Sequence, residues 1–180
     1  MAHDHGAHDH SHGDEPPVMP VDGPTPATTA LEQAGVTFTV VRTQIAHDAE
    51  ESAHLQGIEL GALLRSILVR RAADDYVFVL VPGGRRFDWP KLRAHLGTNR
   101  LSLPDADEAR EVTGYERGAI TPFGARTAWP VIADASIEAR DVVAIGGGAR
   151  GVNVHLAPAV LVAVTGADVV DISVPEPPPA

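Results

Sequence analysis

Two glycine-rich loops and one arginine–serine pair are the parts of this sequence whose residue types could do chemistry. The first loop runs from Gly146 to Gly151, between two stretches rich in β-branched residues. Because glycine lacks a Cβ and accepts positive φ, successive N–H groups there could converge on an oxyanion or a phosphate. A plain hairpin turn has the same composition. A strand is expected after the loop and Gly-Lys-Ser/Thr is missing, so neither a dinucleotide fingerprint nor a Walker loop is present.

The second loop, from Gly114 to Gly124, holds three glycines and one proline. This composition fixes an unusual backbone path, and such loops either line sites or only connect elements. Arg65-Ser66 directly precedes an expected strand. A guanidinium there could clamp a phosphate or polarise a carbonyl, although an ordinary surface position is the commoner place for arginine.

Other kinds of catalytic site find little support in the residue types. The chain has no cysteine, which excludes disulfides, thiolate metal sites and a cysteine nucleophile. No Gly-x-Ser-x-Gly elbow is present, and His47, His54, His95 and His155 lack metal-ligand spacing. His155 alternates with apolar neighbours, so we expect it on one face of a strand, near a site. No cofactor is implied.

Both ends of the chain are expected to be tails around a single folded domain. Residues 1–25 are rich in His, Asp and Pro, have no apolar period, and should therefore be disordered. Residues 174–180 form a Pro-rich tail, which leaves 26–173 as the domain. In a flexible head, Zn, Ni or Cu binding would be adventitious or buffering. Its candidate ligands are His3, His5, His8, His10 and His12.

The charge distribution points to a selective contact with RNA. The formal net charge is −10, which argues against a general nucleic-acid binder and against DNA as a partner. Between Gly61 and Arg100, however, eight basic residues face three acidic ones, a local excess of five positive charges. Such a patch suits one end of an RNA, or is simply a solvated face. No signal peptide or membrane-length apolar stretch is present, so we expect a cytoplasmic protein without a membrane partner.

Short strands and short helices alternate densely through the domain. Helix starts are expected at Thr28 or Thr29, Asp48, Asp88, Pro104 and Pro158. Strands are expected at 36–41, 67–69, 76–81, 129–133, 142–145, 152–156 and 169–172. This order predicts an α/β (α+β) fold with a curved mixed or barrel-like sheet and helices packed outside.

Read in order, these pieces resemble the YbaK/EbsC family of aminoacyl-tRNA deacylases, which includes the prolyl-tRNA synthetase-associated editing domain. The resemblance lies in residues 49–57, 64–69, 81–92, 113–124, 130–134 and 148–158. It implies a YbaK-like domain that hydrolyses the ester between a wrong amino acid and the terminal ribose of tRNA. It also implies that a ribose hydroxyl or a positioned water assists, without a protein nucleophile. The implied partners are the aminoacyl-tRNA acceptor end and an aminoacyl-tRNA synthetase.

The resemblance also implies which residues form the site. Arg65 stands where many members have a lysine before Ser/Thr-Leu, and Lys91 is the only lysine of this chain. Gly118 with Pro122 matches a Gly-x-x-x-Pro loop, and Gly148 with Gly151 matches the second glycine loop. The implied catalytic residues are Arg65, Gly118 and Gly148. The implied substrate-binding residues are Ser66, Thr121, Pro122, Phe123, Gly147, Arg150, Gly151 and His155.

Two further hypotheses compete with editing. Arginine cannot act as a base at neutral pH, although it can donate paired hydrogen bonds to phosphate or carbonyl oxygen. Together with the acidic net charge, Arg65 therefore also fits a module that binds tRNA or a small ligand without cleaving it. The His-rich head alternatively fits a metal-handling protein. The sequence does not fix the rejected amino acid or the oligomeric state.

Overall fold

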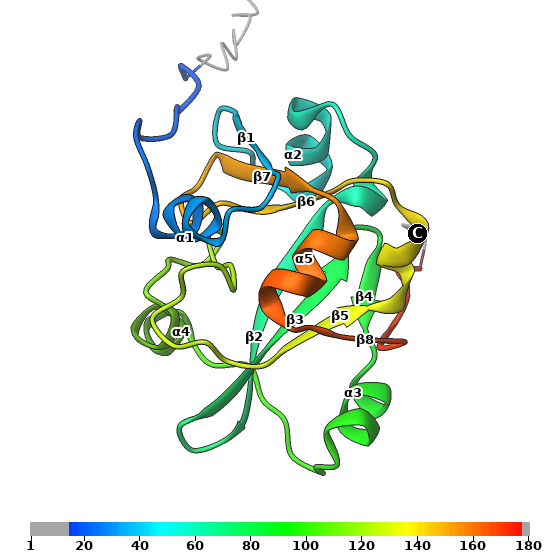
Figure 1. The fold of residues 1–180 in the computed structure, drawn as a ribbon. Coiled ribbons are helices and arrows are strands. Elements are labelled where there is room, and N and C mark those ends of the chain that lie inside the picture. The colour runs from blue at the N-terminus through cyan, green and yellow to red at the C-terminus, as the bar shows by residue number, and fades with distance from the viewer. Residues whose placement is uncertain (1–14, 178–180) are drawn as a thin grey trace, which may run out of the picture.

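A computed structural model describes residues 15–177, which form three β-sheets surrounded by helices (Figure 1). The helices are α1 (Pro26–Ala34), α2 (Ala49–Gln56), α3 (Trp89–Leu96), α4 (Ala106–Thr113) and α5 (Pro158–Thr165), with 3₁₀ turns η1 (Leu60–Ala62) and η2 (Ala135–Ala139). The strands are β1 (Thr39–Arg42), β2 (Leu64–Ala72), β3 (Asp75–Pro82), β4 (Arg85–Phe87), β5 (Val131–Asp134), β6 (Val143–Gly146), β7 (Val152–Leu156), β8 (Asp168–Val170) and β9 (Ser173–Pro175).

The central sheet has the order β2-β3-β5-β8, with β2 at one edge. β2 and β3 form an antiparallel hairpin, whereas β3, β5 and β8 run parallel. Residues 77–81 of β3 are fully buried because the strand is covered on both faces. Phe78 and Leu80 pack into one apolar cluster, which α1, α4 and α5 complete. Val77, Val79 and Val81 pack into the other, which α3 covers through Leu92.

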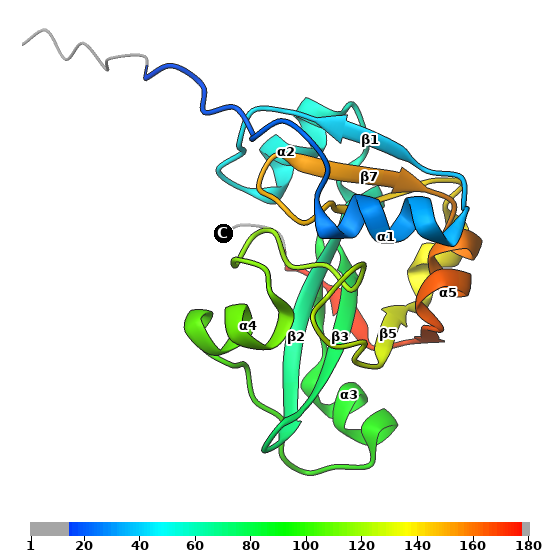
Figure 2. The ribbon, with the colours of Figure 1, turned by 60° about the vertical axis from the view of Figure 1, so that its left-hand side comes forward.

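A smaller antiparallel sheet, β1-β7-β6, lies at one end of the central sheet (Figure 2). The two sheets meet where Leu63, just before β2, forms a parallel bridge with Ala144 of β6. The mixed α+β class predicted from the sequence is confirmed, and the sheets stay open rather than closing into a barrel. At the far end of β2, the hairpin turn lies at the same end of the molecule as α3 (Figures 1 and 2).

The local sequence signals explain most helix ends, with two corrections. Helix α4 begins at Ala106 rather than at Pro104, because the Asp105 carboxylate caps it by accepting the Glu108 amide. Asp48 caps α2 through its carboxylate, which accepts the Glu51 amide, and Gly57 ends that helix in the left-handed conformation, as predicted. The cap of α1 is Thr25 rather than Thr28 or Thr29. Thr25 is the cap because its Oγ1 accepts the Thr28 amide and also donates to the Gly147 carbonyl, 2.5 Å away.

Parts of both expected tails contact the domain. The Val18 carbonyl accepts the Ile45 amide at 2.7 Å, and the Arg42 guanidinium donates to the carbonyls of Val21 and Gly23. At the other end, β9 extends the fold to Pro175 by pairing with β4. The five candidate metal-binding histidines of the head lie outside the described residues. Within residues 15–177 no helix is long and apolar enough to cross a membrane.

Candidate functional site

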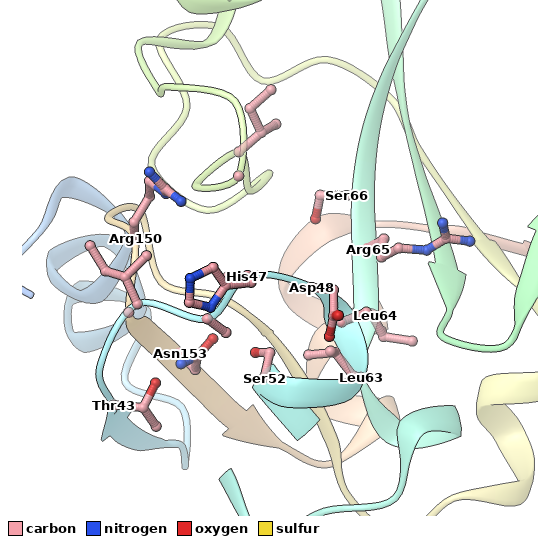
Figure 3. Close-up of a pocket in the computed structure, with 17 residues that line it drawn as sticks. Thr43, His47, Asp48, Ser52, Leu63, Leu64, Arg65, Ser66, Arg150 and Asn153 are labelled. Atoms are coloured by element: carbon pink, nitrogen blue, oxygen red, sulfur yellow. The ribbon is translucent and has the colours of Figure 1, made fainter. Parts of the chain in front are cut away.

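A pocket of about 350 Å³ opens where the two sheets meet (Figure 3). We call it the sheet-junction pocket. Its walls come from the segment leading into α2, the start of β2, both glycine-rich loops and Asn153 of β7. The volume suits a small ligand, because ligand sites usually measure roughly 300–1,000 Å³.

The two glycine-rich loops form one continuous wall of this pocket. A Cβ built on Gly146 would lie 3.4 Å from the Ile120 carbonyl oxygen, and one on Gly118 would lie 3.7 Å from Arg150 Nε. Gly118 has φ 89° and Gly151 has φ 79°, a conformation that favours glycine. Within residues 15–177 the backbone N–H groups of these two glycines donate no hydrogen bond. They are therefore available to a ligand.

Arg65 and Ser66, adjacent on β2, point to opposite sides of the strand. Ser66 is directed toward the pocket, and its Oγ is buried without a hydrogen-bond partner among the described residues (Figure 3). The Arg65 guanidinium leads away from the pocket; it donates to the Arg85 carbonyl and lies 3.8 Å from a Glu176 carboxylate oxygen. The guanidinium expected inside the pocket is thus outside it, because successive side chains of a strand alternate between faces.

Arg150 supplies the guanidinium that lies at this pocket. Its side chain is exposed at the rim, and within the described residues it makes no ion pair or hydrogen bond. Glu15 lines a groove shared with Arg150 but forms no ion pair with it within residues 15–177. The other two nearby acids are engaged elsewhere: Asp48 caps α2, and Glu51 binds the backbone N–H and the ring of His47. These hydrogen bonds, led by that of the His47 amide, lower the pKa of Glu51. The cationic group is therefore the one left free to meet an anionic ligand.

A hydrogen-bonded chain connects His155 to the pocket through α2. His155 Nε2 lies 2.9 Å from Gln56 Oε1, and Gln56 Nε2 donates to Ser52 Oγ at 2.9 Å. Because an amide oxygen only accepts, His155 carries its proton on Nε2. Burial disfavours the imidazolium and lowers the pKa of His155. Ser52 lines the pocket, and its oxygen accepts from Gln56. Among the described residues its hydroxyl donates to no acceptor, so its proton can be donated to a ligand.

The structure brings only some of the sequence-predicted site residues together. Those lining the pocket are Arg65, Ser66, Gly118, Arg150 and Gly151. The remaining ones do not line it: they are Thr121, Pro122, Phe123, Gly147, Gly148 and His155.

Two of these residues, Gly148 and Phe123, hold the two loops through packing and hydrogen bonding. Gly148 packs against α1, since a Cβ there would meet Tyr115 at 3.0 Å and Ala27 at 3.1 Å. Phe123 is buried in the core, and its carbonyl accepts the Tyr115 hydroxyl at 2.6 Å. Burial raises the pKa of Tyr115 to about 12, so its hydroxyl stays a donor. Their positions fix the backbone path of the loops.

Sequence reasoning did not assign five polar residues of the pocket to the site: Thr43, His47, Asp48, Ser52 and Asn153. Two of them carried a usable signal. Asn153 lies two residues before His155 on β7, hence on the same face, and Ser52 lies one helical turn before Gln56. Among residues 15–177, no group of three or more His, Asp or Glu side chains could hold a metal ion.

Comparison with known proteins gives a consistent answer. Residues 43–164 match the family described as the aminoacyl-tRNA editing domain. The chain is 24% identical to a candidate Cys-tRNA(Pro)/Cys-tRNA(Cys) deacylase, EbsC, of Enterococcus faecalis, over 71% of this chain and 78% of that protein. It is 27% identical to the Ser/Thr-tRNA deacylase ProXp-y of Escherichia coli, over 58% of this chain and 64% of that protein.

The chain also matches a solved structure and part of a longer enzyme. A crystal structure of a candidate trans-editing enzyme for prolyl-tRNA synthetase superposes with a TM-score of 0.76 at 28% identity, covering 84% of this chain and 96% of that one. The chain also matches a proline–tRNA ligase of Thermosipho melanesiensis at 32% identity, over 60% of this chain but only 19% of the ligase.

Proposed function

The chain belongs to the aminoacyl-tRNA editing domain family, and we propose that it hydrolyses the ester of mischarged tRNA in the sheet-junction pocket. One observation supports this location most strongly. Both glycine-rich loops, although about 30 residues apart in the sequence, meet at the pocket beside a buried serine hydroxyl that has no partner among the described residues. Preorganised donors of this kind stabilise the charge that develops during acyl transfer.

The reaction needs no protein nucleophile. Water, assisted by the neighbouring ribose hydroxyl, adds to the ester carbonyl, and the bond from that carbon to the ribose oxygen then breaks. The products are the free amino acid and a tRNA whose terminal ribose hydroxyl has regained its proton. The amides of Gly118 and Gly151, with the Ser66 hydroxyl, are the donors that we assign to the transient oxyanion. Positioning supplies the rest of the acceleration.

Arg150 and Arg65 take different roles in this scheme. The exposed Arg150 guanidinium, free of carboxylates, pairs with a phosphate of the terminal nucleotides. Arg65 holds the start of β2 against β4 through the Arg85 carbonyl, and so positions Ser66 without touching the ester. Toward the ester, the position of the usual lysine thus has a positioning role in this chain.

The polar lining of the pocket favours a small polar amino acid as the rejected one. Thr43, Ser52 and Asn153 offer hydroxyl and amide groups to a side chain. His155 and Gln56 fix the Ser52 hydroxyl so that it donates into the pocket. A site built to hydrogen-bond a polar group rejects analogues that lack it. We therefore expect seryl- and cysteinyl-tRNA to be hydrolysed faster than alanyl- or prolyl-tRNA.

A deacylation panel tests the proposal. Alanyl-, cysteinyl-, seryl- and prolyl-tRNA are incubated with the full chain, with the Ser66→Ala variant and with buffer. We expect at least one ester to be lost well above the buffer rate, and the variant to lose most of that activity. Charged tRNA that binds tightly and stays intact would instead identify a binding module.

A truncated chain separates editing from metal handling by the head. We propose that the chain after the His-rich head carries the activity in the cytoplasm, on tRNA that is free or delivered by a synthetase. A chain lacking residues 2–14 should therefore deacylate as fast as the full chain. Loss of activity on truncation, restored by neither added tRNA nor higher enzyme concentration, would favour a role for the histidines.

A further inference from the structure

Arginines follow the outer edge of β2, from the sheet-junction pocket to the hairpin turn, and Ser102 pairs with this edge at Arg70. Two open grooves lie along this edge. The first, about 640 Å³, is lined by Arg65 and Arg86, and Arg65 also lines the sheet-junction pocket. The second, about 600 Å³, lies at the hairpin and α3 end. Its arginines are Arg70, Arg71, Arg93 and Arg100. We call these six residues the arginine track.

Half of the arginine track has no side-chain partner among the described residues. Arg65, Arg70 and Arg71 lie near Glu176, Glu108 and Asp75, respectively. Within residues 15–177, the side chains of Arg86, Arg93 and Arg100 form no ion pair or hydrogen bond. The single acid in the lining of either groove is Asp88. On a chain of net charge −10, this positive edge needs an explanation other than general solubility.

The length of the track matches a polyanion rather than a single phosphate. Arg65 and Arg71 are six residues apart on β2, which corresponds to about 20 Å at about 3.3 Å per residue. A nucleic-acid strand in a duplex carries a phosphate roughly every 3.4 Å along the axis, so several phosphates fit this span. Guanidinium groups bind phosphate with two parallel hydrogen bonds.

We propose that the arginine track binds the backbone phosphates of the tRNA acceptor stem, while the 3′ end enters the sheet-junction pocket. This inference rests on the proposed function, because the pocket sets where the stem begins. The shared lining residue Arg65 connects the two, and the second groove then receives phosphates roughly 20 Å from the ester. The contacts are to the backbone, so they carry no sequence preference.

The double variant Arg93→Gln/Arg100→Gln tests the track without stranding a carboxylate, since neither arginine is paired. The matched control is Arg126→Gln, an exposed arginine outside both grooves. Kd for uncharged full-length tRNA is measured at several salt concentrations. Each lost phosphate contact lowers the slope of log K against log salt by about 0.7–0.9. We expect a slope lower by about 1.5 and a Kd raised about tenfold for the double variant, and no change for the control.

Two substrates then separate the track from the pocket. The double variant should lose about tenfold in kcat/KM on full-length mischarged tRNA and nothing on the aminoacyl ester of the trinucleotide CCA. Unchanged Kd and salt slope would overturn the proposal, as would an equal loss on the trinucleotide ester. If the wild-type chain cleaves neither substrate, the proposed function fails, and binding of uncharged tRNA still decides the track. A loss confined to binding of a synthetase would also overturn it.

Discussion

The sheet-junction pocket and the cluster around Asp134 both contain buried polar groups, but within the described part of the chain those groups are hydrogen-bonded around Asp134 and left without a partner at Ser66 in the pocket. The Asp134 side chain is only 2% exposed, and it accepts the amides of Ile172 and Ser136 at 3.2 and 3.1 Å as well as the Ser136 hydroxyl. Arg85 Nε lies 3.7 Å from it. In the pocket, by contrast, the buried Ser66 hydroxyl has no partner among the described residues.

This difference distinguishes a structural polar cluster from a binding site. A buried polar group without a partner costs stability, so native proteins pair nearly all of them. Asp134 ties the end of β5 to β9 and the segment before it, and its pairing is complete. Ser66 keeps an unmet hydrogen bond, which a ligand can supply. Substitutions at Asp134 should therefore affect folding, and substitutions in the pocket should affect catalysis.

The largest effect is expected from Asp134→Ala. It removes the buried acceptor of two amides and one hydroxyl, together with the carboxylate beside Arg85, which should lower the free energy of unfolding by about 3 kcal/mol. Urea titration measures this, with kcat/KM per folded molecule unchanged. A stable Asp134→Ala protein that has lost its activity would contradict the purely structural role assigned to Asp134.

Acid should remove the stabilisation that the same cluster provides. Burial alone would raise the pKa of Asp134, but hydrogen bonds from Ser136, Ser173 and the Ile172 amide outweigh burial and lower the pKa. Its stabilisation is present above the unfolded pKa of about 3.9 and is lost as pH falls through the lower folded value.

One substitution made in both regions sharpens the contrast. Ser66→Ala should reduce kcat/KM about 100-fold, as removal of one oxyanion donor typically does, and change stability by less than about 0.5 kcal/mol. Ser136→Ala deletes a donor to Asp134 and should cost about 1 kcal/mol of stability with full activity. Steady-state deacylation and urea titration are run on both. The contrast fails if the two variants lose activity equally.

A glycine pair separates backbone strain from chemistry. Gly118 and Gly97 both have positive φ, and a Cβ built on Gly97 meets nothing within 4 Å. Replacement by alanine should cost each protein about 1 kcal/mol of stability. Only Gly118→Ala should also lower kcat/KM, by about tenfold, because it displaces an amide that we assign to the oxyanion. Equal kcat/KM in both variants would remove Gly118 from the site.

The smallest effect is the pH dependence contributed by His155. Its pKa is lowered by burial, so the unfolded chain binds the proton more tightly than the folded one. The stabilisation from neutral His155 is complete above the unfolded pKa of about 6.5 and is lost as pH falls below it. His155→Gln, which keeps a donor toward Gln56, should flatten the pH dependence of the unfolding free energy below about pH 6.5. An unchanged pH profile would show that His155 does not titrate there.

Short-range signals made much of this molecule predictable. The Asp48 carboxylate and Gly57 mark both ends of α2, and the apolar run of β3 marks a strand buried on both faces. The glycines indicated that both loops have an unusual backbone conformation, and the ordered motifs identified the family.

Long-range choices were not predictable in the same way. The side of β2 on which Arg65 emerges depends on strand register, which the dipeptide alone does not encode. β4 and β9 are three residues each and exist only because distant segments pair. Ser52 and Asn153 share a face with Gln56 and His155, respectively, but the long-range contact between Gln56 and His155 that brings α2 to β7 is not specified by spacing along the chain.

The most direct test of the central claim maps a bound substrate analogue by NMR. An aminoacyl-adenosine with an amide in place of the ester cannot turn over by the proposed route, so binding is observed alone. We predict saturable shifts of the backbone amides of Ser66, Gly118 and Gly151, with those of Ser136 and Ile172 unmoved. Saturable shifts confined to residues outside the sheet-junction pocket would contradict the account.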